Sequence, residues 1–347
     1  MSRRSPLDLV LFILALLCCF SGQIIAAEPK AADLVEDGQL IDLSTDHYQK
    51  LFRELQDSHQ FNDKELVELF EGVTIKKRVL ELMDRQWEAK PYYKYRPLFI
   101  TAKTIATGKK KLAAFEDLLS RVEARFGVDK EIVIAIWGIE SRYGTHKGSF
   151  PVFQTLNTLF DAYPRRSSFF RKQLVHFLLL CRENQMDPLE VKGSYAGAFG
   201  QTQFIPSSFR EYAVSFDNDQ RRDVFNSTED IFASIANYLR RFHWSLNAPI
   251  YVDIGPSLNS QELISANLKG RKGRVDYQVV RSSQGVDLPQ PPENRKVSIV
   301  GLEIAPSDGG GFRYVAGYPN FQAITQWNHS NRYAMAVTEL AEAIKVD

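Results

Sequence analysis

A glutamate closes an otherwise apolar stretch in the middle of the chain. Ile132, Ile136 and Glu140 are spaced at i, i+4 and i+8, so a helix places all three side chains on one face. Loss of solvent on that face favours the protonated acid over the carboxylate. A carboxylic acid that stays protonated near neutral pH is what the cleavage of a glycosidic bond requires. Glu140 is therefore a candidate general acid.

A structural role for Glu140 is the alternative. Arg142 and Lys147 follow it closely, and either could pair with a half-buried acid at a helix end. Structural ion pairs perturb carboxylates as catalytic sites do, so the local sequence taken alone favours this interpretation.

The second unusual stretch, residues 193–208, combines small residues with neutral polar and aromatic ones. Its glycines and alanines allow the backbone to approach a ligand or a helix closely. Ser194 and three consecutive polar residues, Gln201, Thr202 and Gln203, supply hydrogen-bonding groups, and Tyr195 supplies a flat ring. Sugars are recognised by this mixture. A tight helix crossing would explain the glycines but would leave the glutamines without a role.

Helices are predicted to position both stretches. Apolar residues recur at helical spacing, with Asp129 as the expected N-cap of the Glu140 helix and Gly127 as the stop of the helix before it. The predicted helical segments are 46–90, 112–126, the Glu140 helix, 168–184, 230–242 and 330–344. Three β-type runs, 250–254, 297–304 and 312–316, interrupt them late in the chain, the last two joined by a hairpin-like turn.

These patterns divide the chain into five regions. The fold class expected is mainly α, or α+β, in which a helical body carries a small β-rich insertion. The regions are a signal peptide (1–27), an N-terminal helical region (28–110), a catalytic core (111–245), the insertion (246–317), and a C-terminal segment that closes back on the body (318–347).

The N-terminus indicates export to the periplasm. A basic Ser2-Arg3-Arg4 precedes an apolar run, and small residues stand before Glu28. An outer-membrane lipoprotein is less favoured, because large residues precede Cys18. After cleavage only Cys181 remains, so the chain forms no internal disulfide and relies on core burial. The net charge of +1 among 347 residues gives no electrostatic case for a nucleic-acid partner.

Several separate motifs together resemble the lytic murein transglycosylase B family, in its order and with similar spacing. The match extends over nearly all of the chain after about Glu65. The motifs are Gly-Ile-Glu-Ser-Arg-Tyr-Gly at 138–144, Tyr-Pro-Arg-Arg at 163–166, Gly-Ser-Tyr-Ala-Gly-Ala at 193–198, Gln-Phe-Ile-Pro-Ser-Ser at 203–208, Ile-Ala-Asn-Tyr-Leu at 235–239, Tyr-Pro-Asn-Phe at 318–321, Trp-Asn-His-Ser at 327–330 and Tyr-Ala-Met-Ala-Val at 333–337.

The resemblance implies a lysozyme-like helical fold that cleaves the MurNAc–GlcNAc β-1,4 bond of peptidoglycan. It makes Glu140 the sole catalytic acid and base. Trp327 departs from the family's usual tyrosine, which keeps an aromatic face but loses a hydroxyl. The residues at family substrate positions are Tyr95, Ser194, Gln203, Tyr238, Trp327 and Asn328.

A lone carboxylate fits a lytic transglycosylase, in which the C6 hydroxyl of the cleaved sugar replaces water and leaves a 1,6-anhydroMurNAc end. A hydrolase ordinarily needs two carboxylates. The sequence does not place Asp161 or Asp187 relative to Glu140, so a muramidase-type hydrolase stays open. A noncatalytic peptidoglycan-binding scaffold is the other alternative.

No cofactor or metal is expected. Some family relatives carry a calcium loop, but residues 215–223 satisfy the EF-hand pattern in neither register, and two arginines there oppose a dication. The partners expected are peptidoglycan glycan strands. Nothing in the sequence indicates a subunit interface, so a monomer is expected.

Overall fold

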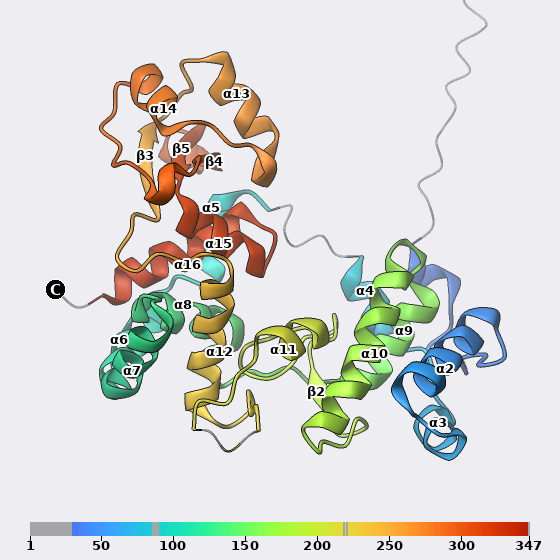
Figure 1. The fold of residues 1–347 in the computed structure, drawn as a ribbon. Helices are drawn as coiled ribbons and strands as arrows, with labels where there is room; N and C mark the ends of the chain where they lie inside the picture. Colours follow the sequence, from blue (N-terminus) through green and yellow to red (C-terminus); the bar gives the residue numbers. More distant parts are fainter. Residues whose placement is uncertain (1–29, 85–89, 218, 220, 346–347) are drawn as a thin grey trace, which may run out of the picture.

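The computed structural model describes residues 30–84, 90–217, 219 and 221–345. The predicted signal peptide, residues 1–27, lies outside the described residues. Within them, no helix combines the length and apolar character needed to cross a membrane. Helices dominate, accompanied by one two-stranded and one three-stranded sheet, which confirms the mainly helical fold class (Figure 1).

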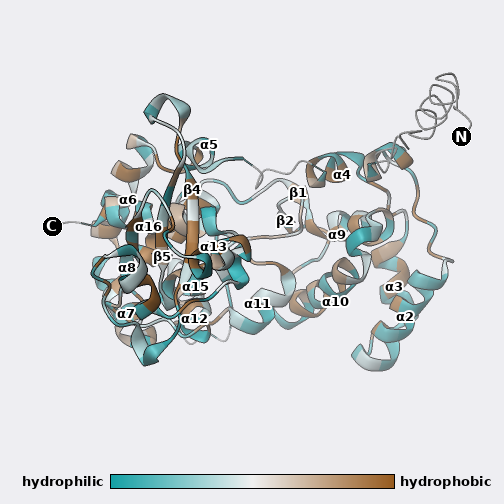
Figure 2. Cartoon of the chain, turned by 90° about the horizontal axis from the view of Figure 1, so that it is seen from above, coloured by the Kyte–Doolittle hydropathy of each residue, from teal (hydrophilic) through white to brown (hydrophobic). Residues whose placement is uncertain are grey.

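The N-terminal helices form one end of the molecule. In Figure 2, α2 and α3 lie beside α9 and α10, far from α6, α7, α8 and α16. The Tyr48 hydroxyl in α2 donates to Asn157 Oδ1 of α9 at 3.1 Å, deep in the core. The N-terminal elements at this end are η1 (Ala31–Leu34), α2 (Asp46–His59), α3 (Asp63–Phe70) and α4 (Lys77–Met83). The chain then continues through α5 (Tyr92–Tyr95), η3 (Arg96–Leu98) and α6 (Ala102–Ala114), which lie at the other end with α8 and α16.

The central region contains the two stretches that the sequence singled out. Its helices pack as one body with the N-terminal ones, because one hydrophobic core runs through both. The elements are α7 (Glu116–Phe126), α8 (Lys130–Ser141), β1 (Phe150–Pro151), α9 (Val152–Ala162), η4 (Pro164–Arg166), α10 (Ser167–Glu183), β2 (Lys192–Gly193), α11 (Pro206–Tyr212) and α12 (Thr228–Arg241).

Helix α8, which ends in the Glu140 turn, is largely enclosed by the body. All residues from 132 to 138 are buried among α6, α7, α12 and α16. Gly127 ends α7 in a left-handed conformation, as predicted. Asp129 is the N-cap residue, but its carboxylate does not cap the helix. It accepts hydrogen bonds from Trp244 Nε1 at 2.7 Å and from the Asn247 amide at 3.2 Å, donors that follow α12.

The β-rich insertion rises from one side of the body (Figure 1). Its antiparallel sheet has the order β3-β5-β4, and the predicted hairpin pairs Ser298 with Gly317 and Glu303 with Phe312. The sequence analysis missed two helices, although Ser260 and Asp276 cap them with their side chains. The elements are β3 (Tyr251–Gly255), α13 (Gln261–Leu268), η5 (Gly270–Lys272), α14 (Tyr277–Gln284), η6 (Pro292–Asn294), β4 (Ser298–Glu303), η7 (Pro306–Asp308) and β5 (Phe312–Gly317).

The chain then returns to the body through α15 (Pro319–Trp327) and α16 (Asn331–Ile344). Helix α16 packs on α8 and α6. Gly108 of α6 makes this close approach possible, since a β-carbon there would stand 2.6 Å from an Ile344 methyl group. The last helix thereby reaches the helix that carries Glu140.

Candidate active site

Glu140 lies in the last turn of α8 and is half-buried. The apolar face on which Glu140 lies predicted a stronger loss of solvent than this. The exposure arises because α8 opens there onto a cavity of about 630 Å³. The cavity is lined by aromatic, threonine and basic side chains together with Glu140: Leu98, Phe99, Thr101, Lys103, Thr104, Thr107, Gly138, Ile139, Arg142, Tyr143, Thr145 and His146.

Tyr333 of α16 is a polar neighbour of this acid. Its hydroxyl donates to Glu140 Oε1 at 2.5 Å, a length typical of a charge-assisted hydrogen bond. Burial raises the pKa of Tyr333 well above its ordinary value, and the negative charge of Glu140 adds to the shift. Tyr333 therefore keeps its proton and acts as a donor throughout the working pH range.

Tyr95 and Tyr238 lie near this pair, since both also act on the pKa of Tyr333. Tyr95 is buried, and its ring centroid is 5.1 Å from that of Phe99, which lines the Glu140 cavity. The structure thus brings together tyrosines from α5, α12 and α16. The sequence analysis assigned no role to Tyr333, because its spacing in the last helix is that of a core residue.

The turn after Glu140 has an unusual backbone. Arg142, Tyr143 and Gly144 all adopt positive φ, at 50°, 57° and 84°. Such conformations cost free energy in residues other than glycine and concentrate at functional sites. Of the two cations proposed to pair with Glu140, Lys147 instead donates through Nζ to the Phe225 carbonyl at 2.9 Å.

The turn carries the chain directly against the second stretch. A β-carbon on Gly148 would stand 2.1 Å from the Gly193 carbonyl group and 2.7 Å from the Ser194 amide nitrogen. Only glycine permits this contact. The predicted use of glycine for close backbone approach is correct, and the partner is another loop rather than a helix.

Ser194 is fixed by its own loop. Its Oγ accepts hydrogen bonds from the Ala196 amide at 3.3 Å and the Ala198 amide at 3.1 Å. With both lone pairs occupied, the hydroxyl has only its proton to offer a ligand. Ser194 is therefore a donor.

Gln203, in contrast, can offer a ligand only a hydrogen-bond acceptor. Its Nε2 donates to the Gly200 carbonyl at 2.8 Å and the Lys147 carbonyl at 3.2 Å, so both amide protons are used inside the protein. Among the described residues nothing donates to its Oε1, which lines a cavity of about 510 Å³. Gln203 is therefore an acceptor.

Gln201 is structural. Its Oε1 accepts from Trp137 Nε1 at 2.8 Å, and its Nε2 donates to the Phe225 carbonyl at 2.8 Å. It ties α8 to the loop that carries Gln203. Gln201 thus supports the loop, and Gln203, which the resemblance placed at a substrate position, keeps its side-chain oxygen for other contacts. Trp137, 4% exposed, is a core residue.

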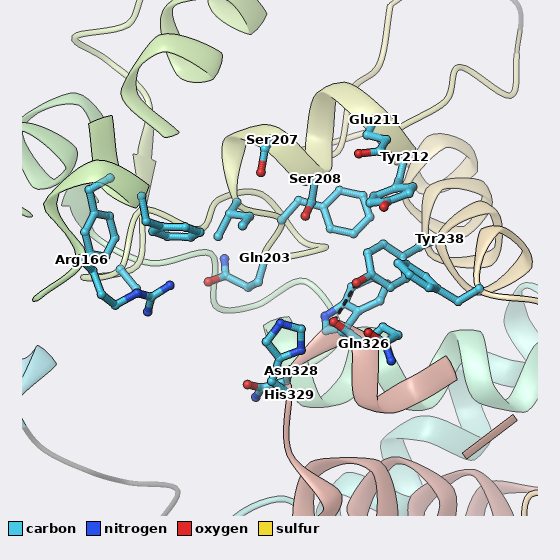
Figure 3. A pocket seen from close by; sticks show the side chains of 17 residues that line it. Arg166, Gln203, Ser207, Ser208, Glu211, Tyr212, Tyr238, Gln326, Asn328 and His329 are labelled. Atoms are coloured by element: carbon cyan, nitrogen blue, oxygen red, sulfur yellow. Dashed lines mark hydrogen bonds between the residues drawn. The ribbon is translucent and has the colours of Figure 1, made fainter. Parts of the chain in front are cut away.

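The cavity at Gln203 is mostly aromatic. The Trp327 ring centroid lies 4.6 Å from that of Tyr238 and 5.0 Å from that of Phe204. The Tyr238 hydroxyl donates to the Gln326 carbonyl at 2.8 Å, which fixes α12 against the end of α15 (Figure 3). In Figure 3, Gln203 lies opposite Tyr238 and Asn328.

Four of the six predicted substrate residues therefore share one cavity, namely Gln203, Tyr238, Trp327 and Asn328. Glu140 lines the other cavity, whose lining shares none of these residues. Ser194 and Tyr95 line neither cavity. Ser194 contacts Ala196, which lines the aromatic cavity, and Tyr95 contacts Phe99, which lines the Glu140 cavity.

Other acids are engaged away from Glu140. Asp161 Oδ1 lies 3.3 Å from His47 Nε2, and Asp187 accepts from the Leu189 amide at 2.8 Å. In the described part of the chain, the cavity at Glu140 has no second carboxylate in its lining. Glu211 is exposed and lines the aromatic cavity instead.

The residues of the loop 215–223 do not fit a calcium site. The Asp230 carboxylate accepts from the Phe216 and Asp223 amides, each at 2.8 Å, and Asp219 accepts from the Arg221 amide at 2.8 Å. Over the described ranges, His, Cys, Asp and Glu side chains form no group of three able to hold a metal ion. Backbone amides thus already use both oxygens of Asp230 and one oxygen of Asp219, which a cation site in the described part of the loop would need as ligands.

Comparison with known proteins agrees with this geometry. Residues 44–342 match the family described as the transglycosylase SLT domain. The chain is similar to the membrane-bound lytic murein transglycosylase B of Escherichia coli (strain K12), with 34% identity over 308 residues that cover 85% of this chain and 82% of that protein.

Two solved structures extend the comparison. The catenated lytic transglycosylase SltB1 of Pseudomonas aeruginosa gives a TM-score of 0.77 at 34% identity, covering 87% of this chain and 97% of that one. SltB3 of the same organism, in complex with NAG-NAM-pentapeptide, gives 0.72 at 31% identity, covering 87% and 79%. The resemblance found in the motifs is therefore confirmed, and the chain belongs to the transglycosylase SLT family of lytic murein transglycosylases.

Proposed function

We propose that Glu140 is the sole catalytic acid and base of this lytic transglycosylase, and that its substrate bond is the MurNAc–GlcNAc β-1,4 linkage of peptidoglycan. The observation that carries the proposal is one half-buried carboxylate in a cavity whose described lining holds no other acid. A hydrolase would need a second carboxylate to activate water or to attack the sugar.

The reaction balances without water. Glu140 gives its proton to the glycosidic oxygen as the bond from that oxygen to C1 breaks. The carbonyl oxygen of the MurNAc acetamido group stabilises the positive charge on C1. The C6 hydroxyl of the same sugar then attacks C1 and returns a proton to Glu140. The products are a free GlcNAc hydroxyl and a 1,6-anhydroMurNAc end, and the acid is regenerated.

Ser194 and Gln203 are suited to hold that acetamido group. Ser194 can only donate and Gln203 can accept, which complements the C=O and N–H of an amide. Both are fixed before substrate arrives, because backbone groups already occupy their remaining hydrogen-bonding capacity. Preorganised groups of this kind cost no reorganisation during the reaction.

Tyr333 assists the second half of the cycle. After protonating the leaving oxygen, Glu140 is a carboxylate, and the Tyr333 hydroxyl stabilises that charged form at 2.5 Å. The aromatic cavity around Tyr238 and Trp327 supplies flat faces for neighbouring sugar rings, with Asn328 at its edge. Tyr95 supports the Glu140 cavity through Phe99.

Digestion of purified sacculi tests the proposal. Glu140→Gln removes the transferable proton while keeping the shape, so activity should fall about a thousandfold. The muropeptides released by the unaltered enzyme should be lighter than hydrolysed ones by the mass of one water. Products with reducing ends would make the enzyme a muramidase-type hydrolase. Full activity in Glu140→Gln would move the chemistry to another residue, and unaltered protein that binds sacculi without cleaving them would make the chain a scaffold.

We further propose that the enzyme acts in the periplasm as a cleaved, exported monomer. This rests on the basic and apolar pattern of residues 1–27. The mass of the mature chain from a fractionated cell tests it, because a lipid-modified Cys18 or Cys19 would leave the protein in the membrane fraction with added mass.

A further inference from the structure

The β-rich insertion reaches the active site through one carboxylate at the end of β4. Glu303 Oε2 accepts the Tyr92 backbone amide at 2.8 Å, at the start of the short helix that ends in Tyr95. Glu303 Oε1 accepts from the Arg332 guanidinium at 2.5 Å, in the first turn of α16. Arg332 directly precedes Tyr333. One carboxylate therefore joins the two backbone segments that carry Tyr95 and Tyr333.

A second carboxylate, that of Glu339, also connects the Tyr95 segment, α16 and the insertion. Glu339 of α16 has a side chain only 11% exposed. Its Oε2 accepts from Arg96 Nε at 2.5 Å, one residue after Tyr95. Its Oε1 accepts from Arg313 of β5 at 2.9 Å. Figure 1 shows α5 between the insertion and the C-terminal helices, where these bonds hold it at both ends.

We propose that Glu303 and Glu339 are positioning residues that fix Tyr95 and Tyr333 against Glu140, so that the β-rich insertion takes part in catalysis. The inference rests on the proposed role of Glu140 as acid and base. Neither carboxylate lines the Glu140 cavity. Each acts through the segment that it holds.

The geometry favours this role over simple attachment of the insertion. The insertion has a hydrophobic cluster of its own, and Val300, Leu302 and Val315 of its strands also pack into the main core, so its attachment does not rest on the two carboxylates alone. Instead, the two oxygens of each carboxylate accept hydrogen bonds from two different elements. The 2.5 Å bond from Tyr333 to Glu140 is short, and short hydrogen bonds lose strength quickly when a partner moves. A displacement of Arg332 is transmitted to the adjacent Tyr333.

Glu303→Gln in the full chain is the first test. The variant keeps an oxygen for the Tyr92 amide but loses the charge that holds Arg332. We expect kcat on sacculi to fall about tenfold with KM changed less than about twofold, because displacement of a supporting group acts mainly on the reacting geometry. Asp287→Asn is the matched control. It removes an ion pair with Arg281 in the same insertion, at a carboxylate that is 92% exposed, and should leave kcat unchanged.

The pH profile separates positioning from loss of fold. With Glu140 as the proposed general acid, we expect lytic activity to fall at high pH, where Glu140 loses its proton before reaction. Tyr333 favours the charged form of Glu140, so Tyr333→Phe should move this alkaline limb to higher pH. Glu303→Gln should move it the same way by a smaller amount. Adding Glu303→Gln to Tyr333→Phe should move it no further, because the two act through one hydrogen bond.

The other charged and titratable groups that line the cavity, Lys103, Arg142, Tyr143 and His146, are unchanged in all these variants. An alkaline limb that stays in place in Glu303→Gln, with activity lowered only in proportion to the folded fraction in a thermal melt, would overturn the proposal. An additive shift in the double variant would do so as well. Neither result touches the proposed function, which is tested separately by the products of the unaltered enzyme and by the activity of Glu140→Gln.

Discussion

The two sides of Glu140 are built in different ways. On one side, the loop 193–208 places Ser194 and Gln203 by contacts within the loop and with the turn that follows Glu140. On the other, Tyr95 and Tyr333 come from segments 238 residues apart by their numbers and are held by carboxylates of the insertion and of α16.

The difference assigns different tasks to the two sides. The loop side is rigid and neutral, which suits the recognition of an amide group. The tyrosine side is ionic and long-range, which suits the control of a proton. Changes on the loop side should alter which sugar is accepted, whereas changes on the tyrosine side should alter the pH dependence.

The largest effect is expected at Gly193, where the backbone of the loop side leaves no space for a side chain. A β-carbon on Gly193 would stand 2.2 Å from the Ala198 carbonyl oxygen. Gly193→Ala must shift the backbone on both sides of Ser194, at a cost of about 3 kcal/mol in unfolding free energy, with loss of activity. Gly285→Ala is the control, with a positive φ but open space around it, and should cost about 1 kcal/mol. Urea unfolding measures both, and equal costs would show that the contact is dispensable.

A smaller and more selective effect is expected at Ser194. Ser194→Ala removes the hydroxyl that we propose donates to the acetamido carbonyl, so kcat/KM should fall about tenfold on intact glycan chains. Chains whose amino sugars have been deacetylated lack that carbonyl, and on them the variant and the unaltered enzyme should react alike. A tenfold loss on both substrates would remove Ser194 from acetamido recognition.

The smallest effect concerns stability in acid. Burial opposes the charge on Glu303, but hydrogen bonds from Arg332 and the Tyr92 amide outweigh it, and its pKa lies below the ordinary value. A depressed pKa contributes stability above the ordinary carboxyl range, which is lost as the pH falls through the folded value. Glu303→Gln should therefore lose less stability than the unaltered chain when both are acidified below about pH 4. Parallel melting curves across that range would contradict the pKa direction.

The loop side was largely predictable from sequence, and the tyrosine side was not. Glycines at fixed positions signal close approach, and Ser194 and Gln203 stand among them as polar exceptions. The periodic spacing of Ile132, Ile136 and Glu140 placed the acid correctly at the end of its helix, although the cavity left it half-buried.

Tyr333 and Glu303 show why the tyrosine side was not predicted from the sequence. Tyr333 has the helical spacing of a core residue, and its hydroxyl gains meaning only when α16 packs on α8. Glu303 is the last residue of a strand, where a glutamate is ordinarily an exposed polar residue. Its partners Tyr92 and Arg332 are remote in sequence. Pairings across such separations depend on tertiary packing, which local patterns do not encode.

The proposed mechanism depends most on the absence of water from the bond-breaking step. Digestion of sacculi in water enriched in heavy oxygen, followed by mass spectrometry of the muropeptides, tests this directly. If Glu140 acts alone and the C6 hydroxyl closes onto C1, the new sugar ends carry no heavy oxygen and retain the anhydro mass. Heavy oxygen at C1 of the released MurNAc would show that water attacks, and would contradict a single carboxylate serving as acid and base in turn.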